Sequence, residues 1–230
     1  MPSNPSAKST GTIYLFYFLT TIAAVFFMKG IVMRTDAAAT AYNIRIHEAS
    51  FRLGIALGLV AIALYIALTA RLYDLFKPVN RNLSLMAAFF SLVGCAIQAL
   101  ATAFQLVPAV ISADALSLNA FSQPQLEALS LFLLRFGGQV FNTGLLFFGF
   151  YCLLLGYLIF KSNFLPHALG ALLALAGAGW LSVLSPHLVI SLTPVVQILG
   201  FVAEVAFMLW LLVKGVNVSR WQKQSSATPS

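Results

Sequence analysis

Six long runs of apolar residues alternate with short polar segments along the 230 residues of the chain. A transmembrane helix needs about 20 mostly apolar residues, because each residue adds about 1.5 Å and the hydrocarbon core is about 30 Å thick. All six runs are of this order, and the third and fourth are longer. They predict transmembrane helices at Thr12–Met33, Leu53–Leu75, Leu83–Ile111, Leu129–Phe160, Ala168–Ser185 and Ile190–Val213.

The polar segments are too short to form a separate soluble domain. We therefore expect an N-terminal tail over residues 1–11, one transmembrane domain over residues 12–216 and a C-terminal tail over residues 217–230. The predicted fold class is all-α, an integral membrane bundle of six transmembrane helices joined by short loops.

The first loop, TDAAATAYNIRIHEASFR at Thr35–Arg52, has a helical pattern of its own. Asp36 is suited to cap the first turn, because a carboxylate can accept hydrogen bonds from the free N–H groups of that turn. Four residues fall near one face of this helix: Ile44, His47, Glu48 and Phe51. The pattern predicts an amphipathic helix that lies in the membrane interface.

Composition agrees with a membrane protein, since 60% of the residues are hydrophobic and 8% are charged. Soluble domains carry about 25% charged residues. The net charge of +7 would suit nucleic acid, but the basic residues do not cluster on a soluble segment, so no nucleic-acid partner is expected. Cys95 and Cys152 lie within apolar runs, which predicts buried thiols rather than a disulfide or a metal site.

The distribution of Lys and Arg predicts the orientation, because cytoplasmic loops of membrane proteins are enriched in both. If the N-terminus is cytoplasmic, the cytoplasmic segments hold Lys8, Arg71, Lys77, Arg81, Lys161, Lys214, Arg220 and Lys223. The outer segments then hold only Arg34, Arg45 and Arg52. Both termini are therefore expected in the cytoplasm.

Counting helical turns from these basic residues estimates how deep each polar side chain lies. Glu204 precedes Lys214 by ten residues, which is about 15 Å and close to the middle of the membrane. Arg135 precedes Lys161 by 26 residues, or about 39 Å, which places it at the outer boundary. By the same count Tyr65 and Ser91 lie near the level of Glu204 and are its expected hydrogen-bond partners.

Amide side chains occupy the level between Glu204 and the outer boundary. Gln98 and Gln197 are about 26 Å from the basic residues of their spans, and Gln139 and Asn142 are at about 33 and 28 Å. Polar residues in spans usually face the bundle interior. We therefore predict a polar pocket open to the outside, with a protonated Glu204 at its floor. Its candidate ligand-binding residues are Glu204, Gln197, Gln98, Gln139, Asn142, Tyr65, Ser91 and Arg135.

A purely structural role remains the alternative for each of these residues. Amide and hydroxyl side chains in spans commonly join helices through hydrogen bonds worth about 0.6 kcal/mol each. Arg135 suits an interfacial residue whose charge reaches the lipid headgroups. Glu204 is harder to explain in this way, because a charge at the centre of a span costs about 2.5–3.5 kcal/mol on insertion scales.

Catalytic motifs are absent from the sequence. It holds no H-E-x-x-H motif, nucleophile elbow, phosphate-binding loop or set of Cys and His residues at metal-ligand spacing. We therefore predict no catalytic residue, no metal and no cofactor. A non-enzymatic role is favoured, although the sequence leaves the question open.

Four segments together carry a family resemblance: AYNIRIHEASFRLGIA, LFKPVNRNLSLMAAFF, FNTGLLFFGFYCLLLGYLIFKSNFLPHALG and AEVAFMLWLLVKGV. The chain resembles, over roughly Tyr42–Val216, a bacterial multi-pass membrane family catalogued as domain of unknown function 4386. The resemblance implies a protein of the bacterial cytoplasmic (inner) membrane. It implies no activity and assigns no functional residue.

These observations favour a membrane protein that binds, or also transports, a small or amphiphilic ligand through the outward-facing polar pocket. The first alternative is a non-catalytic partner or sensor subunit of another membrane protein. The second is a lipid-modifying membrane enzyme that uses Glu204 or His47, which the missing motifs disfavour. The expected partners are the lipid bilayer, the ligand and, for the first alternative, a membrane protein.

Overall fold

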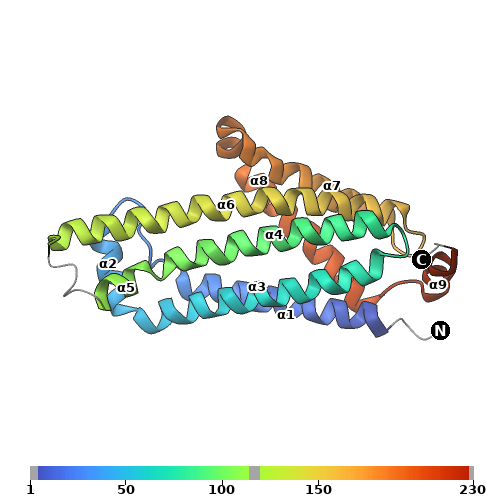
Figure 1. The fold of residues 1–230 in the computed structure, drawn as a ribbon, viewed down its shortest axis with the longest axis horizontal. Helices are drawn as coiled ribbons and strands as arrows, with labels where there is room; N and C mark the ends of the chain where they lie inside the picture. The colour runs from blue at the N-terminus through green and yellow to red at the C-terminus, as the bar shows by residue number, and fades with distance from the viewer. Residues whose placement is uncertain (1–4, 114–119, 228–230) are drawn as a thin grey trace. The chain divides into compact units, whose positions relative to one another are not determined.

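The computed structural model describes residues 5–113 and 120–227, and the regular secondary structure of these residues is entirely helical (Figure 1). The α-helices are α1 (Pro5–Met28), α2 (Ala37–Ile46), α3 (Glu48–Phe76), α4 (Arg81–Gln105), α5 (Val107–Ala113), α6 (Gln123–Lys161), α7 (His167–Trp180), α8 (Pro186–Val213) and α9 (Val218–Ala227). A short 3-10 helix, η1, covers Leu181–Leu184 and joins α7 to α8. The predicted all-α class is confirmed.

Six helical segments of the described residues are long and apolar enough to cross a membrane. They are Ala7–Met28, Glu48–Phe76, Arg81–Ile111, Gln123–Lys161, His167–Leu184 and Ser191–Val213. Each overlaps one of the predicted spans, so the prediction of a multi-pass protein with six transmembrane helices is confirmed.

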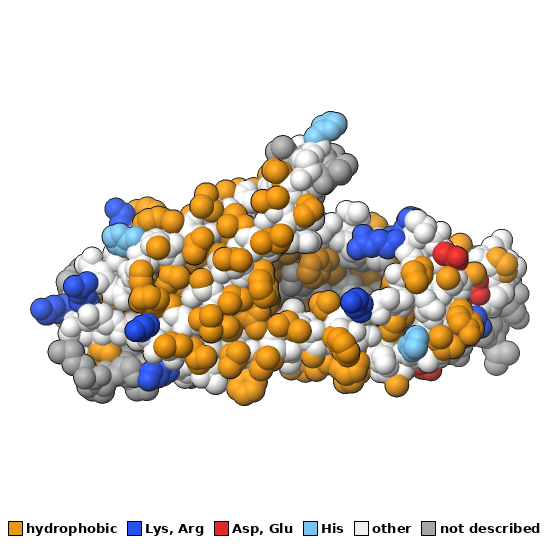
Figure 2. Space-filling model, turned by 180° about the vertical axis from the view of Figure 1, so that it is seen from behind, with side chains coloured by type: hydrophobic (Ala, Val, Ile, Leu, Met, Phe, Trp, Pro, Cys, Tyr) orange, Lys and Arg blue, Asp and Glu red, His pale blue; other side chains and the backbone are white. Residues whose placement is uncertain are grey.

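Large hydrophobic side chains stay exposed along these helices. Phe26, Ile198 and Val213 expose 72%, 66% and 66% of their surface, and hydrophobic side chains spread across the face shown in Figure 2. Lipid tails are as apolar as these side chains, so their exposure in a bilayer has little cost.

The chain divides into two compact units, whose boundaries fall inside α1, α3, α4 and α6. Unit 1 comprises Met1–Phe16, Leu64–Cys95 and Thr143–Ser230, and unit 2 comprises Tyr17–Ala63 and Ala96–Asn142. Each unit thus combines segments that lie far apart in the sequence.

In unit 1, α6 and α7 touch through pairs of glycines. A Cβ atom at Gly156 would lie 2.7 Å from the carbonyl oxygen of Gly170, and one at Gly170 would lie 2.8 Å from that of Gly156. About two helical turns away, a Cβ atom at Gly177 would lie 2.7 Å from the carbonyl oxygen of Gly149. Gly149 and Gly156 are seven residues apart on α6, and so are Gly170 and Gly177 on α7, and the contacts join them in antiparallel order. The two glycines of each helix therefore lie on one contact face. Only glycine allows the backbones to approach this closely.

Glycines also set the contacts that α8 makes within unit 1. A Cβ atom at Gly200 would lie 2.8 Å from the Trp180 ring, where α7 ends, and one at Gly179 would lie 3.1 Å from Val196. A Cβ atom at Gly11 of α1 would lie 2.7 Å from the backbone nitrogen of Leu212. α8 therefore packs closely against α7 and the start of α1 at positions where glycine leaves room.

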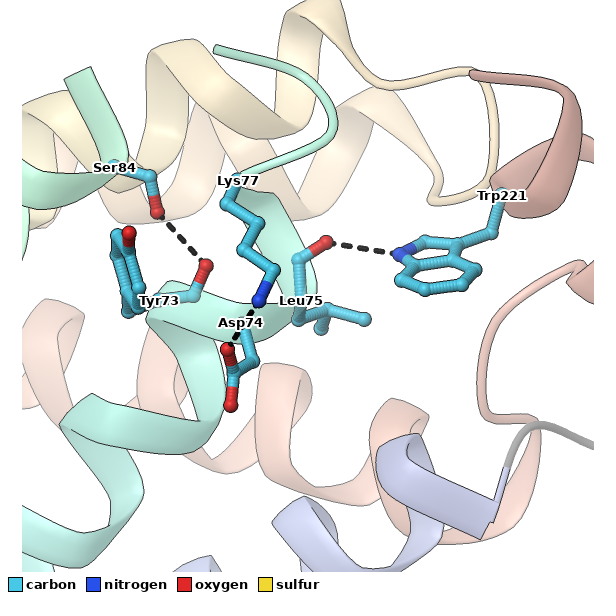
Figure 3. A network of polar contacts seen from close by, with 6 residues as sticks. All are labelled: Tyr73, Asp74, Leu75, Lys77, Ser84 and Trp221. Atoms are coloured by element: carbon cyan, nitrogen blue, oxygen red, sulfur yellow. Dashed lines mark hydrogen bonds and ion pairs between the residues drawn. The ribbon is translucent and has the colours of Figure 1, made fainter. Parts of the chain in front are cut away.

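The C-terminal residues form α9, which is tied to the ends of neighbouring helices of unit 1. The Trp221 indole N–H donates to the Leu75 carbonyl oxygen at 2.9 Å (Figure 3). The last carbonyls of a helix have no partner within the helix, so Trp221 supplies one for α3. Arg220 and Gln224 donate to the carbonyl oxygens of Asn163 and Lys161 at 3.2 and 3.3 Å.

Unit 2 has a small apolar core where the segment after α1 meets α2 and α3. Ile31, Ile44, Phe51 and Ile55 are buried there. The predicted cap is confirmed, because the Asp36 carboxylate accepts a hydrogen bond from the Ala39 N–H at 2.8 Å. This cap starts α2 at the expected place.

The prediction of a single helix over this loop is wrong in its extent. The helix ends at Ile46, and α3 begins at Glu48 after a break at His47. The four residues predicted to share one face differ in burial, because Ile44 and Phe51 are buried whereas His47 and Glu48 are exposed. Glu48 instead pairs with Arg52 at 2.8 Å. The break lets the short α2 and the long α3 take different directions (Figure 1).

The third predicted span contains a second break, at Leu106 between α4 and α5. Pro108 explains it, because proline has no N–H to donate to the carbonyl oxygen four residues earlier and its ring crowds that turn. α5 therefore begins as a separate short helix.

Gly156→Ala tests the glycine contact between α6 and α7. The added methyl group would overlap the Gly170 carbonyl, and overpacking of this kind costs about 1–3 kcal/mol. We expect a lower midpoint of thermal unfolding of the full chain in detergent. Gly138→Ala is the matched control on α6, because nothing lies within 4 Å of a Cβ atom there, and alanine favours a helix over glycine by up to about 1 kcal/mol. Equal midpoints for the two variants would contradict the contact.

Trp221→Phe tests how α9 is held. Phenylalanine keeps an aromatic ring but removes the donor to Leu75, which is worth about 1 kcal/mol. We expect faster trypsin cleavage after Lys214 and Lys223 in the folded protein. Gln222→Ala, at a neighbouring exposed position of α9, should leave the cleavage rate unchanged. Identical rates for both variants would show that the indole does not hold the helix.

Candidate functional site

Glu204 lies within α8 of unit 1 among aromatic hydroxyls that come from other helices. The Tyr14 hydroxyl of α1 forms a hydrogen bond with its carboxyl group. Tyr65 of α3 and Tyr151 and Cys152 of α6 lie near enough to Glu204 to interact with it electrostatically. We call these five residues the Glu204 cluster.

The aromatic rings of the Glu204 cluster pack edge to face with their neighbours. The Tyr65 ring lies 5.1 Å from Phe148 and 6.2 Å from Tyr151, and the Tyr14 ring lies 6.3 Å from Phe207, all measured between centroids. Tyr14, Tyr65 and Tyr151 expose only 2%, 4% and 3% of their surface. Glu204 itself is only partly buried. The three tyrosines are thus fixed by packing around Glu204.

Within the described part of the chain, the Glu204 cluster includes a buried hydroxyl group without a hydrogen-bond partner. The Tyr151 hydroxyl is buried and makes no hydrogen bond with any described residue. A buried hydroxyl without a partner is unfavourable by about 1–3 kcal/mol. An additional polar group beside Tyr151 would remove that cost.

Ser91, the other residue predicted to contact Glu204, belongs to a separate polar contact of unit 1. Its hydroxyl lies 2.7 Å from that of Thr69, which in turn donates to the Tyr65 carbonyl oxygen at 2.9 Å. Ser91 also hydrogen-bonds Cys95. The contact joins α3 to α4 through side chains, which is the ordinary structural role of hydroxyl groups in membrane helices.

The remaining predicted ligand-binding residues are divided between the two units. Gln197 lies in unit 1, whereas Gln98, Arg135, Gln139 and Asn142 lie in unit 2. Arg135, Gln139 and Gln197 are exposed, and Gln98 and Asn142 are partly buried. The pocket that would unite them stays a prediction.

Unit 2 contains a pocket with a volume of about 250 Å³ where α2, α5 and the start of α6 meet. Its lining follows the helical repeat, since residues three and four apart share a face. The lining residues are Ala37, Thr40, Ala41, Ile44 and Arg45 on α2, Pro108 and Ile111 on α5, and Gln123, Leu126, Glu127 and Ser130 on α6. We call this the α2–α6 pocket.

Charged and polar side chains gather along one part of the α2–α6 pocket. Arg45 Nη2 lies 3.9 Å from Glu127 Oε1, and Gln123 donates to the same oxygen at 3.0 Å. The Arg45 side chain is 61% exposed and that of Glu127 only 14%. Arginine has five N–H donors, so this single long contact leaves it able to bind an anionic group.

The pocket side of α2 is held by hydrogen bonds to the segment before it. The Thr40 hydroxyl accepts from the Met33 N–H at 2.9 Å and lies 2.9 Å from the Met33 carbonyl oxygen. Asn43 donates to the Ile31 carbonyl oxygen at 3.3 Å. These bonds keep the lining residues of α2 in place.

The described side chains form no group of three or more His, Cys, Asp or Glu that could hold a metal ion.

Outside the spans, the hydrogen bond from Lys77 to Asp74 at 2.8 Å (Figure 3) and the charge of Asp74 raise the pKa of Lys77. Lys77 thus acts as a local ion-pair partner at the end of α3.

Sequence reasoning missed four residues of these two sites: Tyr14, Tyr151, Arg45 and Glu127. Tyr151 could have been found, because it precedes Lys161 by ten residues just as Glu204 precedes Lys214. Opposite charges on two predicted outer loops hinted at the pair of Arg45 and Glu127. Tyr14 gave no such signal, since its count from Lys8 places it only about 9 Å deep.

Comparisons with known proteins identify relatives but no activity. A family described as a domain of unknown function (DUF4386) matches residues 9–215. A protein of Archaeoglobus fulgidus described as an uncharacterized protein is 30% identical over 159 residues, which cover 69% of this chain and 81% of that protein. No solved structure matches the chain. Because this relative is archaeal, the bacterial source implied by the resemblance stays a prediction.

Tyr14→Phe tests the contact between Tyr14 and Glu204. The variant keeps the packed ring and removes the hydroxyl donor, which should lower the free energy of unfolding by about 1 kcal/mol. The measurement is the midpoint of thermal unfolding in detergent. Tyr42→Phe, whose ring is 58% exposed, is the control and should unfold like the unmodified protein. A Tyr14→Phe midpoint equal to the control would mean that the hydrogen bond contributes nothing.

Proposed function

The chain belongs to the family described as a domain of unknown function (DUF4386), as its sequence resemblance predicted, and we propose that it is a membrane protein that binds a small amphiphilic ligand. The α2–α6 pocket supports this proposal. It combines an apolar lining with an ion pair at one side. Such a combination suits a ligand with an apolar part and a charged end.

The volume of the pocket limits the size of the ligand. Pockets for drug-sized molecules measure about 300–1,000 Å³, and the α2–α6 pocket is slightly smaller at about 250 Å³. It therefore suits a short amphiphile, or the end of a longer one. Ile44, Ile111 and Leu126 would contact the apolar part.

Arg45 is the group that would bind the charged end of the ligand. Its side chain is largely exposed and its contact with Glu127 is long at 3.9 Å. A carboxylate or phosphate group could take a shorter, charge-assisted hydrogen bond from it. The proposed ligand is thus an anionic amphiphile.

The distribution of basic residues supports an outward-facing pocket. Its lining comes from the two segments expected on the outer side, around α2 and at the start of α6. A ligand would enter from outside the cytoplasmic membrane or from the outer leaflet. Transport would need a second, inward-facing arrangement, and we propose binding alone.

A photoactivatable medium-chain fatty acid in phosphatidylcholine vesicles tests the proposal. We expect cross-links to peptides of α2 and the start of α6, mapped by mass spectrometry, and competition by the unlabelled fatty acid. Ala41→Trp fills the pocket and should lower this labelling about tenfold, the ratio that corresponds to 1.4 kcal/mol. Ala38→Trp is the matched control, because Ala38 lies on the exposed side of α2.

A second pair of variants tests the charged end. Arg45→Gln removes the cation and should weaken labelling by the fatty acid about tenfold. The methyl ester of the fatty acid, which has no charge, should still label this variant. Arg52→Gln removes an exposed cation that pairs with Glu48 and should change neither. Uniform labelling of all spans, unaffected by Ala41→Trp, would refute the site.

A further inference from the structure

We propose that Glu204 is a proton-binding site, in which the neutral carboxyl group is held between the hydroxyl groups of Tyr14 and Tyr151. The site lies in unit 1 and is independent of the α2–α6 pocket. This proposal explains why a carboxyl group lies far from both ends of α8. It also provides a partner for the Tyr151 hydroxyl, which forms no hydrogen bond with any described residue.

The partners of the other acidic residues show why Glu204 differs from them. Among the described residues, Glu48, Asp74 and Glu127 each have a Lys or Arg within salt-bridge distance. Asp36 caps α2 instead. No described Lys or Arg forms a salt bridge with Glu204. A charged carboxylate there would have no cation to offset the loss of water, and proton uptake removes that charge.

The hydroxyl groups of Tyr14 and Tyr151 can supply both hydrogen bonds that a neutral carboxyl group needs. A protonated carboxyl group has one oxygen that accepts and one O–H that donates. Tyr14 already forms a hydrogen bond with the carboxyl group and would donate to the accepting oxygen. The Tyr151 hydroxyl, which no described residue contacts by a hydrogen bond, would accept from the O–H. Both oxygens of the neutral carboxyl group, and the Tyr151 hydroxyl, then each have a hydrogen-bond partner.

The remaining groups near Glu204 leave the proton with the carboxyl group. The titratable groups that face it are Tyr14 on α1, Tyr65 on α3, and Tyr151 and Cys152 on α6. Ordinary tyrosines and cysteines lose a proton only at alkaline pH. Within this cluster the carboxyl group is therefore the most acidic group, and the one expected to release its proton first as the pH rises.

Infrared spectroscopy of the full chain in phosphatidylcholine vesicles tests the proposal without knowledge of a ligand. We expect a carbonyl band of a protonated carboxylic acid that disappears reversibly as the pH rises through the range from about 5 to 9. Carbon-13 labelling of glutamate should shift the band. Only three glutamates are present, Glu48, Glu127 and Glu204, and the first two have cationic partners.

Variants assign the band and its hydrogen bonds. Glu204→Gln should abolish it, and Glu48→Gln, at an exposed ion pair, should leave it unchanged. Tyr14→Phe and Tyr151→Phe should each shift its frequency, because each removes one hydrogen bond from the neutral carboxyl group. Tyr42→Phe should not. If Glu204→Gln does not fold, the labelled unmodified protein and the two tyrosine variants still decide the outcome.

Three results would overturn the proposal. The first is the absence of a glutamate-derived carbonyl band at every pH in this range. The second is a band that does not respond to pH, since the proton would then not exchange. The third is a band that persists in Glu204→Gln or keeps its frequency in both tyrosine variants.

Discussion

The close contact between the backbones of α6 and α7 is the constraint on which the arrangement of unit 1 depends. Burial of apolar side chains does not drive helices together in lipid, because the lipid tails are equally apolar. Close packing and hydrogen bonds between helices have to provide the attraction. Gly156 with Gly170, and Gly149 with Gly177, supply it at two levels of the same face. Any larger residue at these four positions would push the helices apart.

The glycine contact also determines where the chemistry of unit 1 lies. Tyr151 and Cys152 are between Gly149 and Gly156 on α6, so their positions follow from the contact. α7 leads through η1 into α8, and the close contact of Gly200 with Trp180 holds α8 against the end of α7. Glu204 lies one turn beyond Gly200. The glycines of α6, α7 and α8 therefore help to bring Tyr151 and Cys152 close to Glu204.

Some features of the fold could be predicted from the sequence, and others could not. The six spans were predictable because a bilayer demands long apolar helices regardless of their neighbours. The Asp36 cap was predictable because it depends only on the next three residues. The contact of Glu204 with Tyr14 was not, because turn counting gives a depth but not which helix faces which. The counts also carry no information on the rotation of each helix about its axis.

Six membrane-spanning helices, and the place of Glu204 far from the ends of one of them, could be inferred from the amino-acid sequence. Both follow from local quantities, which are the length of apolar runs and the distance to a basic residue. The positions of Tyr14, Tyr65 and Tyr151 around Glu204, and the contact of Arg45 with Glu127 beside a pocket, are visible only in the folded chain. The reason is that these contacts join residues separated by many turns of helix. Helix rotation and close packing select them, and neither is encoded in the apolar pattern of a single span.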